Sequence, residues 1–239
     1  MNSFFRGLVD LFYPPRCLSC NDLLISGESG GFCQECWSRI SFLSPPMCQI
    51  CGAPLPSGEN SAIICPRCTE SPPPFQICRS IGRYESVLLE AVHALKYRGE
   101  IPAGIALGKI LSSCVGEHFP VHDYDRVIPV PLHVKRLRKR GFNQSLILAR
   151  AIARDFTLTL DFQSLRRRRH TDPQIGLGRK QREENVREAF VCVRGKEIEN
   201  SKILLIDDVY TTGSTVTECA RVLIEGGAQS VAVATVARA

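Results

Sequence analysis

The sequence predicts an α/β protein, a doubly wound parallel sheet preceded by a small cysteine-rich module, and two observations lead to this. Short apolar runs alternate with longer amphipathic segments in the last two thirds of the chain, as they do where helices connect parallel strands. Most of the twelve cysteines instead fall between residues 17 and 68. A chain of 239 residues can bury an α/β core and still hold a second module. We therefore expect two domains, residues 1–70 and 71–239.

The cysteines of the first module form four C-x-x-C pairs, which are Cys17/Cys20, Cys33/Cys36, Cys48/Cys51 and Cys65/Cys68. Gaps of 12 residues within the first half and 13 within the second divide them into near-equal halves. Each half can offer four thiolates to one tetrahedral zinc ion, which predicts a double zinc ribbon with two structural Zn²⁺ ions. Disulfides are not expected, because nothing in the sequence directs the chain to secretion.

Two points about this module stay open from the sequence. The ligands could pair sequentially or in a cross-braced arrangement, since both use the same spacings. The ribbons could offer a contact surface for nucleic acid or protein, or zinc could simply replace a core in a short segment. Gly52 follows a cysteine knuckle and is expected at positive φ. The four remaining cysteines lie singly in apolar stretches and are expected in the core: Cys78, Cys114, Cys192 and Cys219.

The rest of the chain reads as alternating helices and strands. Expected strands lie near residues 126–131, 163–168, 189–193, 202–206 and 230–236. Expected helices cover residues 86–97, 103–118, 144–156 and 179–189, and a further one begins at about Val216. Asn143 is expected to cap the helix over 144–156. Residues 4–12 have apolar side chains at helical spacing and predict a short amphipathic helix, and SPPPF at 71–75 is a stiff spacer.

The most informative stretch is KILLIDDVYTTGSTVTECARVL, residues 202–223. A buried strand is followed by Asp207 and Asp208, then by a hydroxyl- and glycine-rich loop at the start of a helix. Backbone N–H groups and the helix dipole would bind a phosphate there, and Gly213 would allow its close approach. Two carboxylates beside a phosphate site suit a ligand that also carries hydroxyl groups or a divalent metal ion. A sugar phosphate has these features.

Two basic segments complete the pattern. A strand ends at Pro131 and leads into a loop with five cations, Lys135 to Arg140. Four consecutive arginines, Arg166 to Arg169, begin a second loop that is rich in glycine and proline. Such segments suit a polyanion, although a solvated loop or a generic nucleic-acid patch has the same composition. The net charge of +6 permits such ligands, and no apolar run is long enough to cross a membrane, so we expect a cytoplasmic protein.

The segment IDDVYTTGST resembles the 5-phosphoribosyl-1-pyrophosphate (PRPP) loop of type I phosphoribosyltransferases. The resemblance implies that Asp207 and Asp208 are catalytic and hold the ribose 2′- and 3′-hydroxyls, with Mg²⁺ arriving with PRPP. It implies that the 5′-phosphate is wrapped by Thr211, Thr212, Gly213, Ser214 and Thr215. It further implies that the loop with His133, Lys135 and Arg136 cradles pyrophosphate. A flexible loop would close over PRPP, with Arg168, Arg169, His170 and Gln174 as its candidate residues.

Across the whole chain, LKYRG, PVPLH, RGFNQ and IDDVYTTGST, together with the zinc ribbons, resemble the ComF family of natural competence. This implies a role in DNA uptake, with single-stranded DNA and a competence helicase-type protein as partners. Three kinds of function stay open. The chain is a phosphoribosyltransferase with an unknown acceptor, a PRPP-sensing regulator without catalysis, or a single-stranded DNA-binding protein.

Overall fold

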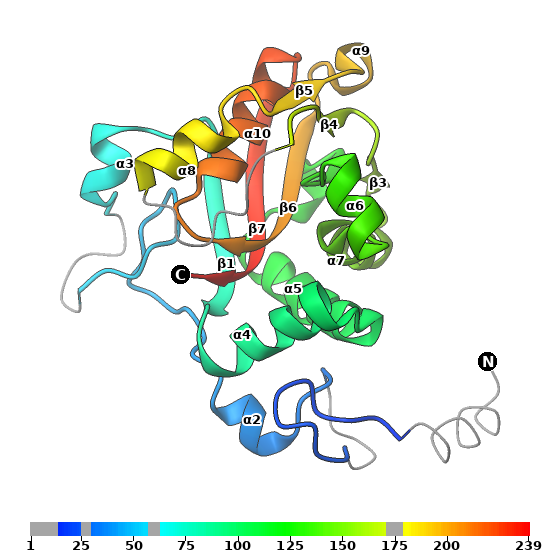
Figure 1. The fold of residues 1–239 in the computed structure, drawn as a ribbon. Helices are drawn as coiled ribbons and strands as arrows, with labels where there is room; N and C mark the ends of the chain where they lie inside the picture. The colour runs from blue at the N-terminus through cyan, green and yellow to red at the C-terminus, as the bar shows by residue number, and fades with distance from the viewer. Residues whose placement is uncertain (1–13, 25–29, 57–62, 171–178) are drawn as a thin grey trace.

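The computed structural model describes residues 14–24, 30–56, 63–170 and 179–239 (Figure 1). Its centre is a five-stranded sheet in the order β1-β7-β6-β2-β3, in which every neighbouring pair of strands is parallel. The strands are β1 (Ile77–Arg83), β2 (Arg126–Pro129), β3 (Thr159–Leu160), β6 (Lys202–Tyr210) and β7 (Ser230–Arg238). The predicted parallel α/β sheet is confirmed.

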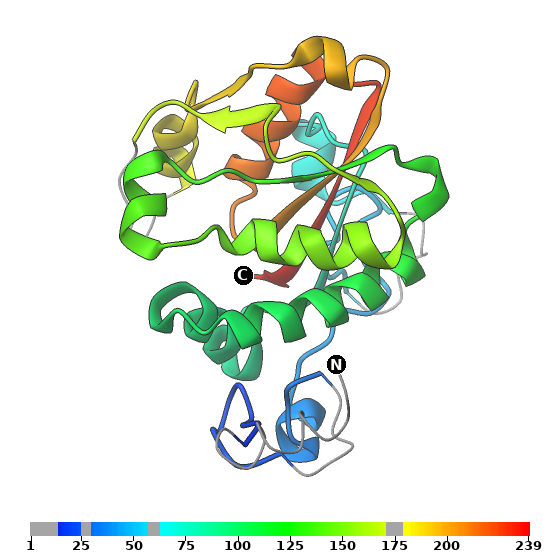
Figure 2. The same cartoon turned by 90° about the vertical axis from the view of Figure 1, so that its right-hand side faces the viewer.

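Helices cover both faces of this sheet. One face packs against α4 (Ser86–His93), α5 (Ile101–His118) and α7 (Gln144–Asp155), and the other against α10 (Ser214–Glu225). Figure 2 shows α5 and α7 running side by side across the first face. In β6, Leu204 and Ile206 belong to the core under α5 and α7, whereas Ile203 and Leu205 belong to the core under α10. Because neighbouring residues of a strand point to opposite faces, an unbroken apolar run is what a sheet buried on both faces requires.

Two of the predicted strands were wrongly placed in this sheet. The 163–168 and 189–193 segments form β4 (Leu165–Arg167) and β5 (Phe190–Cys192), which pair antiparallel as a separate two-stranded sheet. Arg166 is exposed and Val191 is half-buried, so these strands lack the apolar character that a central parallel strand needs. The two edge positions of the large sheet are taken instead by β1 and β3, which the sequence pattern did not identify as strands.

The basic segment after β2 is mostly helical, which corrects the prediction of a loop. Helix α6 covers Val134–Arg140 and has no buried residue. The His133 side chain accepts a hydrogen bond from the Lys135 N–H at its start, and Gly141 ends it at φ +86°. Three cations in its last turn face the negative end of the helix dipole, which stabilises this short helix. The N-cap role expected for Asn143 in the next helix is confirmed, because its side chain accepts from the Ser145 N–H.

The remaining elements are short. The expected helix over 86–97 is confirmed as α4, but its last turn widens into a π-helix, η1 (Ala94–Arg98), which Gly99 ends at φ +71°. The others are α2 (Gln34–Ser38), α3 (Pro66–Glu70), η2 (Val121–Asp123), α8 (Arg179–Val186) and α9 (Gly195–Ile198). The helix expected over residues 4–12 lies outside the described residues. None of the helices in the described ranges is both long and apolar enough to cross a membrane.

Both halves of the cysteine module pack against the α/β body. Cys17 and Cys36 belong to the hydrophobic core that includes α4 and α5, and Cys48 and Cys68 to the core that includes α10. Figure 1 shows α2 beyond α4 and α5, and α3 beside α8. Gly52 has φ +71°, as expected. Cys78, Cys114 and Cys219 are buried, and Cys192 is half-buried. The domain boundary at residue 70 stays a prediction.

Candidate functional site

The acid pair lies near the carboxyl end of β6, which continues four residues beyond the predicted end at Ile206. Asp207 and Asp208 are 8% and 5% exposed. The Ser145 hydroxyl, at the start of α7, donates a 3.0 Å hydrogen bond to Asp207 Oδ1. Lys96 Nζ, from the π-helical turn, lies 2.9 Å from Asp208 Oδ1. Two neighbouring elements therefore fix the orientation of both carboxylates.

Asp207 and Asp208 form a buried acid pair whose negative charge is partly neutralised by Lys96. Burial, and then the charge of Asp208, raise the pKa of Asp207 to about 7. Burial acts to lower the pKa of Lys96, but the carboxylate of Asp208 outweighs it and the pKa is raised. Within the part of the chain that the structure describes, the buried Oδ2 of Asp208 has no hydrogen-bond partner. An ionised oxygen without a partner in a buried position is costly, and it is a ready acceptor for a ligand hydroxyl.

The loop after β6 has the geometry of an anion site. Gly213 adopts φ +79° at the N-cap of α10, so the first N–H groups of a 12-residue helix face the loop. Thr212 Oγ1 and Ser214 Oγ lie 2.6 Å apart and form a hydrogen bond across the turn. A Cβ at position 213 would meet the Tyr210 hydroxyl at 2.3 Å, so the position requires glycine for both space and conformation.

A cleft of about 760 Å³ opens over the acid pair and this loop. Six of the predicted ligand-binding residues line it: Asp207, Asp208, Thr211, Gly213, Thr215 and Arg136. The other four predicted residues do not line this cleft. His133 caps α6, Lys135 is exposed on α6, Thr212 bonds to Ser214, and Ser214 lines a second cleft behind the loop.

Several cleft residues were not identified as site residues from the sequence. Lys139, Arg140 and Arg167 were placed only in basic segments suited to a polyanion, and the others were given no site role: Tyr84, Lys96, Tyr97, Arg98, Gln144 and Ser145. Lys96, Tyr97 and Arg98 belong to the LKYRG stretch, which contributes to the family resemblance and to the end of an expected helix but was given no ligand-binding role. A buried lysine carries no periodicity signal, so only its ion pair with Asp208 identifies it. Tyr97 is 61% exposed, and the Arg140 guanidinium lies 6.0 Å from the centre of its ring.

The residues predicted for the flexible loop lie partly within the described ranges. Arg168 and Arg169 follow β4, and Arg169 Nη2 donates to the carbonyl oxygens of Asn185 and Arg187. The ring of His170 lies 5.1 Å from that of His133, edge to face, so this segment meets the start of α6. Gln174 lies outside the described residues.

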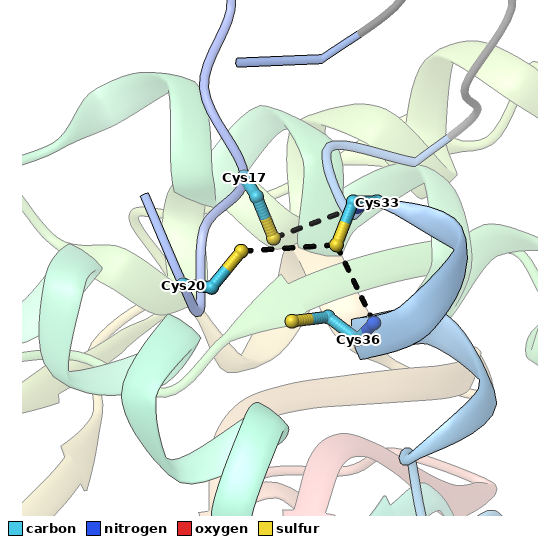
Figure 3. Close-up of side chains that lie close together, drawn as sticks. All are labelled: Cys17, Cys20, Cys33 and Cys36. Carbon is cyan, nitrogen blue, oxygen red and sulfur yellow. Dashed lines mark hydrogen bonds between the residues drawn. The ribbon is translucent and has the colours of Figure 1, made fainter. Parts of the chain in front are cut away.

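The eight predicted zinc ligands form two tetrads in sequential pairing, Cys17–Cys20–Cys33–Cys36 and Cys48–Cys51–Cys65–Cys68. In each tetrad all four sulfur atoms lie within 4.8 Å of one another, and Figure 3 shows those of the first tetrad converging on a common centre. The Cys20–Cys33 and Cys51–Cys65 sulfur pairs are both separated by 3.7 Å. Sulfurs about 2.3 Å from a tetrahedral zinc would be separated by about 3.8 Å, so both tetrads fit Zn²⁺.

The surroundings of the second tetrad favour thiolate over thiol at one ligand. Burial acts to raise the pKa of Cys48, but N–H groups of Cys65, Cys51 and Ile50 outweigh it and lower the pKa to about 6. In the first tetrad, N–H groups lower the pKa of Cys17 to about 7 against the same effect of burial. Thiolate is the form that binds zinc, so these backbone donors favour the metal-binding form at one ligand of each tetrad, whereas burial raises the pKa of Cys36 and Cys51.

Comparison with known proteins agrees with this arrangement of a cysteine module and a parallel α/β domain. Residues 8–69 match the model of a double zinc ribbon domain, and residues 143–239 match that of a phosphoribosyl transferase domain. The fold and the two modules therefore define a phosphoribosyltransferase-type protein with zinc ribbons.

Relatives that match over most of the chain identify the family within this class of protein. The chain is 33% identical over 233 residues to DNA utilization protein YhgH of Shigella flexneri, covering 93% of this chain and 96% of that protein. It is 30% identical to Competence protein F of Haemophilus influenzae, over 95% and 99% of the two chains. It is 27% identical to Competence protein ComFC of Bacillus subtilis, over 82% and 78%. The chain belongs to the ComF family of competence and DNA utilization proteins.

Proposed function

We propose that the chain binds PRPP in the cleft over the acid pair and acts in DNA uptake or a related use of DNA. The observation that carries the proposal is the buried Asp208 Oδ2, which has no partner among the described residues and lines the same cleft as the anion loop. A ribose hydroxyl donating to this oxygen would satisfy it. The 5′-phosphate would then lie on the loop from Thr211 to Thr215, at the N-terminus of α10.

One wall of the cleft carries cationic side chains that could bind the pyrophosphate group. Arg136, Lys139 and Arg140 line the cleft from α6, and Lys96 lies beside the acid pair. His133 and Lys135, at the start of α6, would support this wall from outside the cleft. Mg²⁺ would arrive with PRPP and be held mainly by pyrophosphate oxygens, because Asp208 Oδ1 is already paired with Lys96.

If an acceptor is present, the proposed chemistry is transfer of the phosphoribosyl group. The bond from ribose C1 to the pyrophosphate oxygen breaks, its electron pair leaves with the pyrophosphate, and a lone pair of the acceptor forms the new bond to C1. Cations of the cleft wall stabilise the charge on the leaving group, and Asp207 and Asp208 orient the ribose as C1 becomes electron-poor. We place this activity in the cytoplasm, where twelve free cysteines stay reduced.

A second candidate is binding of single-stranded DNA, with or without PRPP as a regulator. It is favoured by the outer side of α6, where Lys135 and Arg138 are exposed and do not line the cleft. The contact between His133 and His170 continues this surface to the exposed Arg168. A basic stripe of this kind would follow a phosphate backbone. A competence helicase-type partner is part of this alternative, on the strength of the family resemblance alone.

Calorimetric titration of Mg²⁺–PRPP into the zinc-loaded chain tests the proposal. Saturable binding is expected for the wild type, with loss in Asp207→Asn/Asp208→Asn, which keeps the size of both side chains. Absence of binding to the wild type would refute the proposal. An acceptor screen for released pyrophosphate then separates a transferase from a regulator. The DNA alternative predicts steeply salt-dependent binding of a single-stranded oligonucleotide, weakened by Lys135→Ala/Arg138→Ala, two residues outside the cleft.

A further inference from the structure

The two cysteine tetrads contact the α/β body in different places. The first packs with α4 and α5: Cys17 and Cys36 share a core with Leu107 of α5. The second packs next to β1 and behind the anion loop, because Arg79 Nη1 donates to the carbonyl oxygen of Gln49 and Cys78 N–H to that of Ile50. Cys68 of the second tetrad lines a cleft together with Tyr210 and Ser214, which flank the anion loop.

A direct contact joins the second tetrad to the anion loop. Arg67 lies between Cys65, which is the N-cap of α3, and Cys68, which is within α3. Its guanidinium Nη2 donates a hydrogen bond to the carbonyl oxygen of Thr212. A second cleft of about 450 Å³ lies behind the loop and is lined by Cys68 and Arg67 on one side and by Tyr210 and Ser214 on the other. The zinc knuckle and the loop thus line one cleft, together with residues of α8 such as Glu184 and Val186.

Another connection runs through the end of β7. Arg238 Nη1 donates a 2.7 Å hydrogen bond to the carbonyl oxygen of Cys51, and its Nη2 lies 3.7 Å from the Cys51 sulfur. The Arg238 guanidinium also lies 4.3 Å from the centre of the Tyr210 ring. Tyr210 is 3% exposed, and its hydroxyl occupies the space beneath Gly213. Arg238 therefore links a zinc ligand to the residue that supports the turn of the loop.

We propose that Arg67 and Arg238 are positioning residues through which the second zinc site sets the conformation of the anion loop, so that zinc there controls ligand affinity. The sulfurs of Cys65 and Cys68 fix the backbone of α3, from which the Arg67 guanidinium reaches the loop. The sulfur of Cys51 fixes the backbone carbonyl group that accepts a hydrogen bond from Arg238. Without zinc the cysteine sulfurs no longer tie these knuckles to one another, and the loop carbonyl loses a fixed donor. The first tetrad stabilises its own ribbon and leaves the loop unaffected. The readout with PRPP rests on the proposed function, whereas the conformational coupling does not.

Hydrogen exchange of the loop amides, measured by mass spectrometry without any ligand, tests the coupling. Arg67→Ala is expected to speed exchange in residues 211–217 and leave 202–206 unchanged, with both zinc ions still bound. Arg67→Lys should restore part of the protection, because it keeps a charged donor on α3. The matched control is Glu35→Ala, at the corresponding exposed position of the first half, between Cys33 and Cys36. Wild-type exchange of the loop in Arg67→Ala would overturn the proposal.

The metal itself is tested in a Cys20→Ser variant, which removes an exposed ligand of the first tetrad and leaves the second tetrad intact. Chelating the remaining zinc is expected to speed exchange in 211–217, and unchanged exchange would overturn the proposal. PRPP affinity is then measured on the same variants. Arg67→Ala should weaken it by about tenfold, the effect of losing one charge-assisted hydrogen bond, while Glu35→Ala leaves it unchanged. If the wild type binds no PRPP, the proposed function is refuted. The hydrogen-exchange result then still decides whether the second zinc site and the loop are coupled.

Discussion

Replacing Lys96 with methionine removes the ammonium group that neutralises the acid pair while keeping most of the side-chain volume. Lys96 Nζ lies 2.9 Å from Asp208 Oδ1, and the two side chains are 16% and 6% exposed. Removing one partner from a buried ion pair costs about 3–5 kcal/mol. The partial exposure of Lys96, and the ability of Asp207 to take up a proton near pH 7, reduce the expected loss of unfolding free energy to about 2–3 kcal/mol at pH 8.

The loss of unfolding free energy in Lys96→Met should increase as pH rises. Because the pKa of Asp207 is raised in the folded chain, its ionisation destabilises the fold as pH rises from about 4 through about 7. Lys96 compensates for that charge, so Lys96→Met should cost less than about 1 kcal/mol at pH 5.5 and most at pH 8.

Urea unfolding followed by circular dichroism, with zinc present, measures both values. Arg98→Met is the control, because Arg98 pairs with Glu100 on the surface, where both side chains are more than 40% exposed. It should cost under about 1 kcal/mol at either pH. Equal stability of Lys96→Met and the wild type at pH 8, or the same loss at both pH values, would refute this description of the acid pair.

Three further predictions concern the loop, the acid pair and the zinc sites. Gly213→Ala should abolish PRPP binding in calorimetry, because φ is +79° there and the new methyl would meet the Tyr210 hydroxyl; wild-type affinity would contradict the loop geometry. PRPP affinity should rise between pH 6 and pH 8 as Asp207, with a pKa of about 7, ionises and accepts from a ribose hydroxyl. Asp207→Asn should flatten that rise, and an equally steep profile in the variant would assign it to another group. Metal analysis should find two zinc ions in the wild type and one in Cys68→Ser, whereas two in that variant would exclude Cys68 as an essential ligand.

The sequence predicts the parts of this structure that depend on local patterns. The apolar run of β6 indicates a strand buried on both faces, because Ile203 to Ile206 is too short a run for a helix. The C-x-x-C spacings indicate two tetrads, because each knuckle brings two sulfurs to one ion. Asn143 is recognised from the sequence as a helix N-cap, and Gly213 as a position where a phosphate can approach the backbone.

What the sequence does not predict depends on contacts between distant residues. Lys96 and Ser145 reach the acid pair from elements that lie far from β6 in the chain, and nothing in their own neighbourhoods distinguishes them. The edge strand β1 mixes charged and small residues because only part of it needs to be apolar. The basic segment over 134–140 becomes a helix through His133 and Gly141 at its ends, while its charges alone suggested a loop. The connection from Arg67 to Thr212 spans 145 residues and has no local signal.

The central claim is that the acid pair accepts hydrogen bonds from ribose hydroxyls, with Asp208 Oδ2 as the oxygen that needs a donor. Competition of ribose 5-phosphate and 2-deoxyribose 5-phosphate against bound PRPP tests it most directly, because the two sugars share the phosphate and differ by one hydroxyl. We expect the deoxy sugar to compete at least about tenfold more weakly, since it leaves a buried acceptor unpaired. Equal competition by the two sugars would contradict the claim and leave the loop as a phosphate site without ribose recognition.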